Sequence, residues 1–140
     1  MLNKVLIIED ETELSNILKK YLIRRRYEVE CVETLRESFV LLSTQSFGAI
    51  ILDNNLPDGK GIDYIKEFKR LQPELKIIAI SALQINDAAL NAGANYFIEK
   101  PISLKMIESL APALRAASLI CKALIAIIFN SGCSRLNSLI

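Results

Sequence analysis

The sequence contains no histidine. This absence excludes a histidine base, a histidine metal site and a phosphohistidine within the chain. Any acid–base or phosphoryl chemistry must therefore use carboxylates, lysines and hydroxyl groups, or a histidine that belongs to a partner protein.

Cysteine is scarce, and the chain has no excess of charge of one sign. Cys31, Cys121 and Cys133 are odd in number and lack metal-type spacing. Polar and acidic residues interrupt the first stretch, so we expect no signal peptide, reduced thiols and a cytoplasmic location. Lysine and arginine total 17 against 16 acidic residues, a net charge of +1. This balance gives no electrostatic reason to expect direct nucleic-acid contact.

Five short segments are typical of β-strands. Residues 5–8, 49–52, 77–80 and 96–98 are unbroken apolar runs, which suit strands covered on both faces of a parallel sheet. Residues 27–32 alternate instead, with Tyr27, Val29 and Cys31 on one face and Glu28 and Glu30 on the other. That alternation predicts an edge strand.

Segments with helical spacing lie between and after the expected strands. The first has apolar residues at Leu14, Ile17, Leu18, Tyr21 and Leu22, with Thr12 as its expected N-cap, and the second opens at Thr34 and carries Leu35, Phe39 and Leu42. The third carries Ile62, Ile65, Phe68 and Leu71 and is closed by Pro73. A short fourth helix over residues 87–91 ends at Gly93, and a fifth begins at Ser103. The 140-residue chain is long enough for one core. Alternating strands and helices predict an α/β fold, a doubly wound (βα)5 flavodoxin-like parallel sheet with strand order 2-1-3-4-5.

Polar side chains follow four of these strands. Glu9 and Asp10 follow the first, Asp53 and Asn55 the third, Ser81 the fourth and Lys100 the fifth. Because parallel strands end at one edge of the sheet, we expect these groups to converge there. Acidic residues after strands often only cap the next helix, and Glu11 and Glu13 fit that simpler role. The whole set predicts a site with carboxylates for Mg²⁺ and a lysine and a hydroxyl for a phosphate.

Four ordered motifs in residues 5–11, 53–61, 81–82 and 93–101 resemble those of response-regulator receiver domains, the CheY-like family of two-component signalling. The resemblance covers roughly residues 2–117. It implies that Asp53 accepts a phosphoryl group from a sensor histidine kinase or phosphotransfer protein. It also implies Mg²⁺ binding by Asp10 directly, by Glu9 through water, by Asp53 and by the Asn55 carbonyl.

The resemblance assigns the remaining site residues to signalling. Lys100 pairs with Asp53 and then with the phosphate, Ser81 bonds a phosphate oxygen, and Phe97 turns inward as the switch aromatic. Phe97 is alternatively a plain core residue. The family also implies a cis bond before Pro101. Two departures stand out: the stretch from Ser81 to Lys100 is short, and Leu83 is apolar beside the position of the hydrolytic water.

We expect a receiver domain over residues 1–117 and an extended apolar C-terminal helix with a short tail over 118–140. The apolar run after Lys122 is too short to span a bilayer, which argues against a membrane anchor. We expect the helix to pack on another copy, giving a dimer or other homo-oligomer, or on a partner. Folding back on its own domain and a foreign or truncated tail are the alternatives.

The leading hypothesis is a phosphorylation-activated receiver that switches protein–protein contacts. It is not an enzyme, since it assists only its own phosphorylation and dephosphorylation. The alternative is a phosphorylation-independent interaction or dimerisation module. A hydrolase on a similar fold would need a second carboxylate two residues after Asp53, where the chain has Asn55.

Overall fold

The computed structural model describes residues 3–102 of the chain. The expected helix from Ser103, the boundary at residue 117 and the apolar segment 118–140 lie outside the described residues. No helix within residues 3–102 combines the length and hydrophobicity needed to cross a membrane.

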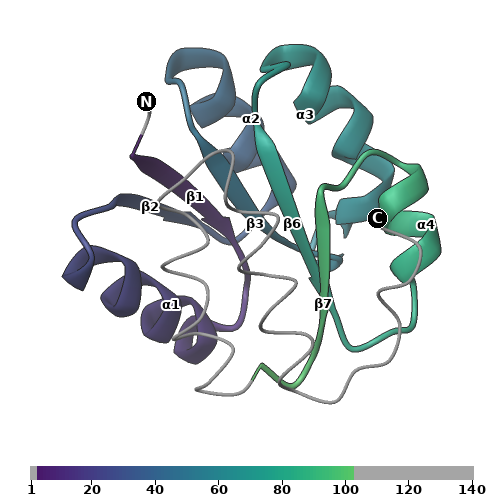
Figure 1. Ribbon diagram of the computed structural model, residues 1–140, viewed down its shortest axis with the longest axis horizontal. Coiled ribbons are helices and arrows are strands. Elements are labelled where there is room, and N and C mark those ends of the chain that lie inside the picture. Colours follow the sequence, from purple (N-terminus) through teal and green to yellow (C-terminus); the bar gives the residue numbers. More distant parts are fainter. Residues whose placement is uncertain (1–2, 103–140) are drawn as a thin grey trace. The chain divides into compact units, whose positions relative to one another are not determined.

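Five parallel strands form the central sheet (Figure 1). They are β1 (Lys4–Ile8), β2 (Glu28–Val32), β3 (Ala49–Asp53), β6 (Lys76–Ser81) and β7 (Tyr96–Glu99). Their order across the sheet is β2-β1-β3-β6-β7. Counted along the chain, this is the predicted 2-1-3-4-5 order, so the doubly wound fold is confirmed. β2 lies at an edge, as its weaker apolar pattern predicts.

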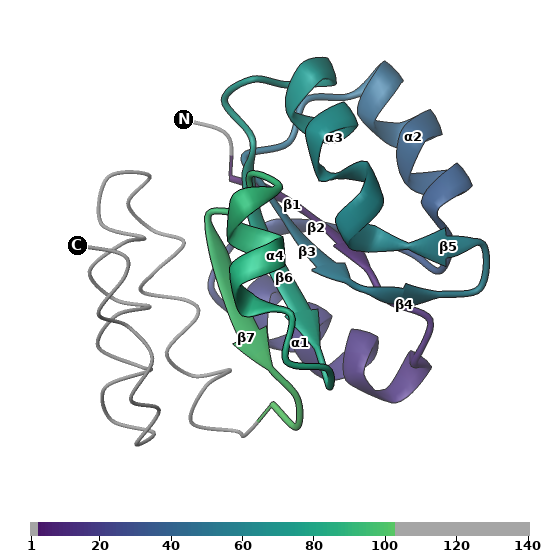
Figure 2. The same cartoon turned by 90° about the vertical axis from the view of Figure 1, so that its right-hand side faces the viewer.

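Helices cover both faces of the sheet (Figure 2). They are α1 (Thr12–Arg24), α2 (Leu35–Thr44), α3 (Ile65–Leu71), which follows a 3-10 turn at Gly61–Tyr64, and α4 (Asn86–Asn91). Leu6 and Ile8 of β1 share a core with α2, α3 and α4. Successive strand residues point to opposite faces, which leaves Val5 and Ile7 buried on the side where α1 packs.

The helical periodicity predicts α2 well and α1 less well. Thr34 caps α2, because its Oγ1 accepts a hydrogen bond from the Glu37 N–H. The expected N-cap at Thr12 is wrong: Thr12 is the first helical residue, and Glu11 precedes it without a side-chain cap. Ile17 has the spacing of a core residue but is 41% exposed, since α1 buries Ser15, Leu18 and Leu22.

Two local features differ from the simple pattern. Glu30 is half-buried, so β2 does not separate cleanly into an apolar and a charged face. A small antiparallel hairpin of β4 (Asn55–Leu56) and β5 (Gly59–Lys60) follows β3. The periodicity gave no sign of this hairpin, because strands of two residues are too short to show one.

Candidate functional site

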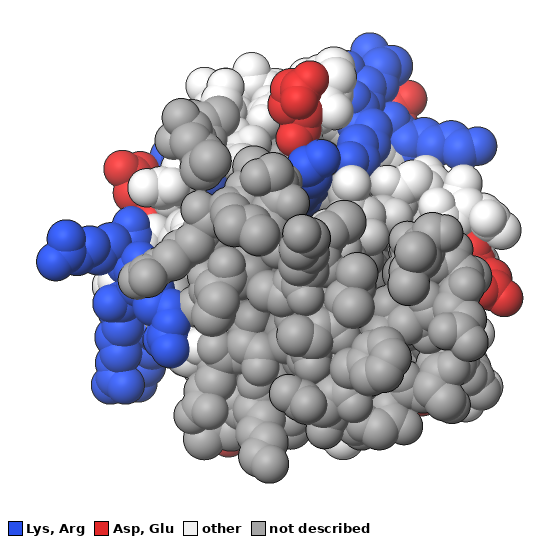
Figure 3. Space-filling view, in the orientation of Figure 1, with Lys and Arg blue, Asp and Glu red and all other residues white. Residues whose placement is uncertain are grey.

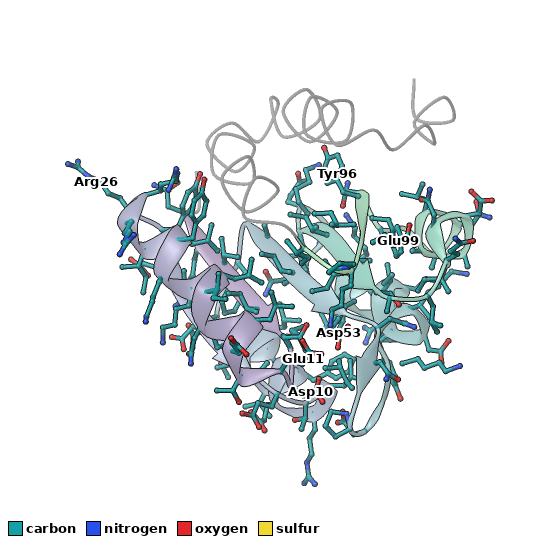
Figure 4. All side chains as sticks on the ribbon, turned by 90° about the horizontal axis from the view of Figure 1, so that it is seen from below. Asp10, Glu11, Arg26, Asp53, Tyr96 and Glu99 are labelled. Carbon is teal, nitrogen blue, oxygen red and sulfur yellow. The ribbon has the colours of Figure 1, made fainter. Side chains whose placement is uncertain are left out.

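Three carboxylates meet where β1 and β3 end. Glu9 and Asp10 follow β1, and Asp53 is the last residue of β3, which pairs in parallel with β1. One oxygen from each of these three carboxylates lies within 4.8 Å of the other two. Figure 4 shows Asp10 and Asp53 at this edge, with Glu11 beside them. The structure therefore brings together the acidic residues that the sequence placed at separate strand ends.

Glu9 and Asp53 are buried, at 1% and 3% exposure, which makes their charges costly. Burial raises the pKa of Glu9 to about 7; a hydrogen bond from the Glu11 backbone opposes this rise, and the charge of Asp53 adds to it. Burial likewise raises the pKa of Asp53, while Lys100 opposes that change. These carboxylates therefore need a cation beside them to ionise readily at neutral pH.

Lys100 reaches the acidic cluster from the end of β7. Its Nζ lies 3.1 Å from Oε2 of Glu9, 3.3 Å from Oδ1 of Asp53 and 4.0 Å from Oε2 of Glu11. Partial burial lowers the pKa of Lys100, but its interactions with Glu9 and Asp53 outweigh burial and hold that pKa above its usual value. Lys100 is thus a shared counter-ion. The bond between Lys100 and Pro101 is cis.

The hydroxyl, amide and aromatic residues expected at the site lie on neighbouring elements. Ser81 ends β6 and is buried, and its Oγ accepts a hydrogen bond of 3.0 Å from the Leu83 N–H. Asn55 begins β4, and its backbone N–H bonds the Asp53 carboxylate. Phe97 of β7 is half-buried and packs against the core beside Ala79 of β6.

Asn54, which the sequence analysis did not single out, holds the loop after β3. It is buried; its Oδ1 accepts the Ile62 N–H at 3.0 Å and its backbone carbonyl accepts the Gly61 N–H at 2.9 Å. An asparagine in a turn commonly bonds nearby backbone in this way, which is the signal that could have identified it. Asn54 closes the loop onto the start of the 3-10 turn.

Gly61 allows this closure, because a Cβ there would lie 2.5 Å from the Asp53 backbone oxygen and 2.9 Å from Cγ of Leu52. We expect Gly61→Ala to lower the free energy of unfolding by roughly 1–3 kcal/mol, since the backbone would have to move. Urea unfolding measures the change. Lys60→Ala, at the exposed neighbouring position, is the control and should stay within about 0.5 kcal/mol of wild type. A Gly61→Ala protein as stable as wild type would contradict the close approach.

The donor set fits a divalent cation. Carboxylate oxygens are hard ligands of the kind that Mg²⁺ and Ca²⁺ take in proteins. Oε2 of Glu9 is buried and accepts no hydrogen bond of normal geometry from the described residues, although Nζ of Lys100 is 3.1 Å away. A cation or its bound water would supply that oxygen with the missing partner. The residues present can therefore hold a divalent metal ion.

Basic side chains gather away from this site. Lys19, Lys20, Arg24, Arg25 and Arg26 lie in α1 and just after it. Lys and Arg crowd the part of Figure 3 that corresponds to α1 in Figure 1. Arg26 is at the opposite end of α1 from Asp10 and Glu11 in Figure 4. Arg24 lies in the last turn of α1, where the negative end of the helix dipole favours a positive charge.

Residues 5–111 match the family model described as "Response regulator receiver domain". The chain is 32% identical over 116 residues to the response regulator protein PilR of Pseudomonas aeruginosa, covering 80% of this chain and 26% of PilR. The chain spans about half, or less, of the length of the curated relatives that it matches.

Two solved structures share the fold. A response regulator protein from Burkholderia pseudomallei, crystallised with a phosphorylated aspartic acid, a calcium ion and citrate, has a TM-score of 0.72 and 26% identity. The match covers 85% of this chain and 71% of that one. The beryllofluoride-activated NtrC4 receiver domain dimer has a TM-score of 0.74 and 28% identity, covering 81% of this chain and 96% of that one.

Proposed function

The chain belongs to the response regulator receiver domain family, and from this premise we propose that Asp53 accepts a phosphoryl group from a histidine of a sensor kinase or phosphotransfer protein. The observation that carries the proposal is the setting of Asp53, which is buried among carboxylates with Nζ of Lys100 3.3 Å away. Because these 140 residues contain no histidine, the donor imidazole lies outside this sequence.

The transfer is a displacement at phosphorus. An oxygen of the ionised Asp53 carboxylate attacks, and a new O–P bond forms while the N–P bond to the donor imidazole breaks. The electron pair of that N–P bond stays on the imidazole nitrogen. The ring leaves as neutral imidazole when its other nitrogen carries a proton, and otherwise the released nitrogen takes a proton from water. Lys100 favours the ionised, nucleophilic form of Asp53 before transfer and pairs with a phosphate oxygen afterwards.

Asp10 would ligate Mg²⁺ directly, Glu9 through water, and Asp53 and the Asn55 backbone carbonyl would complete the protein's share. When bound, the ion neutralises charge on the phosphoryl oxygens as the group is transferred. Oε2 of Glu9 is buried and forms an ion pair with Lys100 but accepts no hydrogen bond of normal geometry, which supports the water-mediated role. The calcium ion reported with the phosphorylated Burkholderia relative supports a divalent cation here.

Ser81 and Phe97 would carry the signal from the phosphorylated site. The Ser81 oxygen accepts the Leu83 N–H, so its own hydrogen is available to donate to a phosphate oxygen. A move of Ser81 toward the phosphate would leave space for Phe97 to turn inward. The result would be a change in the protein–protein contacts of this signalling domain, and homo-oligomer formation would be one form of that change.

Incubation of the full chain with acetyl phosphate and Mg²⁺, followed by intact mass measurement, tests the proposal. We expect a gain of one phosphoryl group, located at Asp53 by peptide mapping, and no gain when the metal is chelated. A wild-type chain that stays unmodified under these conditions would instead indicate a phosphorylation-independent interaction module.

The phosphorylated form should be long-lived, because Leu83 is 57% exposed beside Ser81 and offers no group to orient a hydrolytic water. We expect Leu83→Glu to shorten its lifetime about tenfold, equivalent to ~1.4 kcal/mol in the hydrolysis barrier. Decay of the phosphorylated mass after removal of donor measures this. Gln84→Glu adds the same charge at the next exposed position and serves as control. A wild-type lifetime of seconds that Leu83→Glu does not change would refute the prediction.

A further inference from the structure

Asp58 joins the loop after β3 to a distant helix. It lies in the turn between β4 and β5, and its two carboxylate oxygens accept hydrogen bonds from the first turn of α2. The Leu35 N–H donates to Oδ1 at 2.9 Å and the Arg36 N–H donates to Oδ2 at 3.0 Å. The first N–H groups of a helix have no partner within the helix, and here a residue from another loop supplies one.

Thr34 and Asp58 cap different N–H groups at the start of α2. Thr34 Oγ1 accepts the Glu37 N–H at 3.2 Å, so the local cap leaves the Leu35 and Arg36 N–H groups for Asp58. These bonds lower the pKa of Asp58, which keeps its carboxylate ionised opposite the positive end of the helix dipole. Thr34 therefore serves the helix alone, whereas Asp58 connects the helix to the hairpin.

The helix that Asp58 caps, α2, is also held at its C-terminal end by a side chain from another part of the chain. Nε2 of Gln72 donates to the backbone oxygens of Leu42 and Gln45, at 2.8 and 2.7 Å, where α2 ends. Oε1 of Gln72 accepts the Phe47 N–H at 2.9 Å, at the entry to β3. Side chains from other parts of the chain thus hydrogen-bond both ends of α2. The hairpin is therefore bonded to a helix that is anchored at both of its ends.

The hairpin also lies close against α2. A Cβ on Gly59 would be 3.1 Å from Cδ1 of Leu35, and the φ of Gly59 is +154°. The same hairpin begins with Asn55, which pairs with Lys60. Asp58 is not among the carboxylates whose oxygens converge at the described acidic site, so it does not contact a cation there directly. Its link to that site runs through the hairpin backbone that begins at Asn55.

We propose that Asp58 is a positioning residue for the metal site: by binding the N-terminus of α2 it fixes the β4–β5 hairpin and hence the Asn55 backbone carbonyl. This inference rests on the proposed function, in which that carbonyl is a ligand. Residues outside the ligand shell that orient a ligand commonly change metal affinity about tenfold or more when they are removed.

Calorimetric titration of the full chain with Mg²⁺ tests the inference without any phosphoryl donor. Asp58→Ala is expected to weaken Mg²⁺ binding about tenfold. Thr34→Ala is the matched control, because it removes a cap from the same helix end but no contact with the hairpin. Both substitutions should lower the melting temperature, while only Asp58→Ala should change Mg²⁺ affinity. Asp58→Asn keeps an acceptor oxygen and should restore part of the affinity.

Phosphorylation by acetyl phosphate gives a second measurement. Asp58→Ala should slow uptake at low Mg²⁺ and reach the wild-type rate at saturating Mg²⁺, since the substitution alters binding of the ion and not the nucleophile. Wild-type Mg²⁺ affinity in Asp58→Ala, or an equal loss in Thr34→Ala, would overturn the inference. A wild type that binds Mg²⁺ but takes no phosphoryl group would overturn the proposed function alone, and one that binds no Mg²⁺ would overturn both.

Discussion

Asp53→Ala is expected to abolish phosphoryl uptake, reducing it by roughly three orders of magnitude or more. The reason is the loss of the attacking oxygen. Asp10 and Glu9 are close by, but they are proposed to hold the cation and its water, and burial keeps the pKa of Glu9 at about 7. Intact mass measurement with acetyl phosphate and Mg²⁺ gives the result directly. Asp63→Ala removes an exposed aspartate from the following 3-10 turn and should leave uptake unchanged.

A second substitution at Asp53 distinguishes a loss of phosphoryl uptake from a loss of folding. Asp53→Asn keeps the shape of the side chain but removes a buried charge that raises the pKa of Glu9. We expect this variant to take no phosphoryl group and yet to be at least as stable as wild type in urea at pH 8 without metal. Retained uptake in either Asp53 variant would mean that another group accepts the phosphoryl group, and a strongly destabilised Asp53→Asn would contradict the electrostatic cost inferred for the cluster.

The metal-free protein should lose stability as the pH rises from about 5 to 8. The pKa of Glu9 is raised from 4.5 to about 7 in the folded chain, so between these values the folded state binds a proton that the unfolded state has released. The stabilisation is present in full below about pH 4.5 and is lost as the pH rises through about 7. The difference between the two pKa values corresponds to about 3 kcal/mol at most. Asp53 acts in the same direction, because its pKa is also raised.

Urea unfolding at several pH values in the presence of a chelator measures this dependence. Glu9→Gln cannot ionise and should flatten the profile. Added Mg²⁺ should reverse the trend, because it binds the ionised carboxylates of the folded state, so its stabilising effect grows with pH. Asp58, whose pKa is lowered, acts at more acidic pH and does not alter the sign in this window. A wild-type stability that stays level or rises between pH 5 and 8 without metal would contradict the assignment.

The sequence predicted best the features that depend on near neighbours in the chain, although the N-cap expected at Thr12 was wrong. The apolar runs gave the buried strands, and Thr34 gave the N-cap of α2, because a cap and the N–H it accepts are three residues apart. The pattern was misleading at Ile17, which has core spacing but lies on an exposed face of α1. Periodicity specifies a helix face, whereas the packing of α1 on the sheet decides how much of that face is covered.

The sequence predicted which residues form the candidate site, but not how deeply their charged groups are buried. Parallel strands end at one edge, so the positions of Glu9, Asp10, Asp53 and Lys100 after their strands implied that they would meet. The pairing of Lys100 with Asp53 was expected from the resemblance, but its second pairing with Glu9 was not. The burial of the carboxylates could not be predicted either, because desolvation depends on atoms from every surrounding element.

The sequence by itself determined the strand and helix order, the sheet topology and the residues gathered at the edge of the sheet, because these follow from local periodicity and from the geometry of parallel strands. Only the tertiary structure decided that Lys100 contacts Glu9 as well as Asp53, that burial raises the pKa of Glu9 to about 7 and that Asp58 caps a helix 22 or 23 residues earlier. Each of these depends on atoms brought together by loop closure, and no spacing along the chain specifies such contacts.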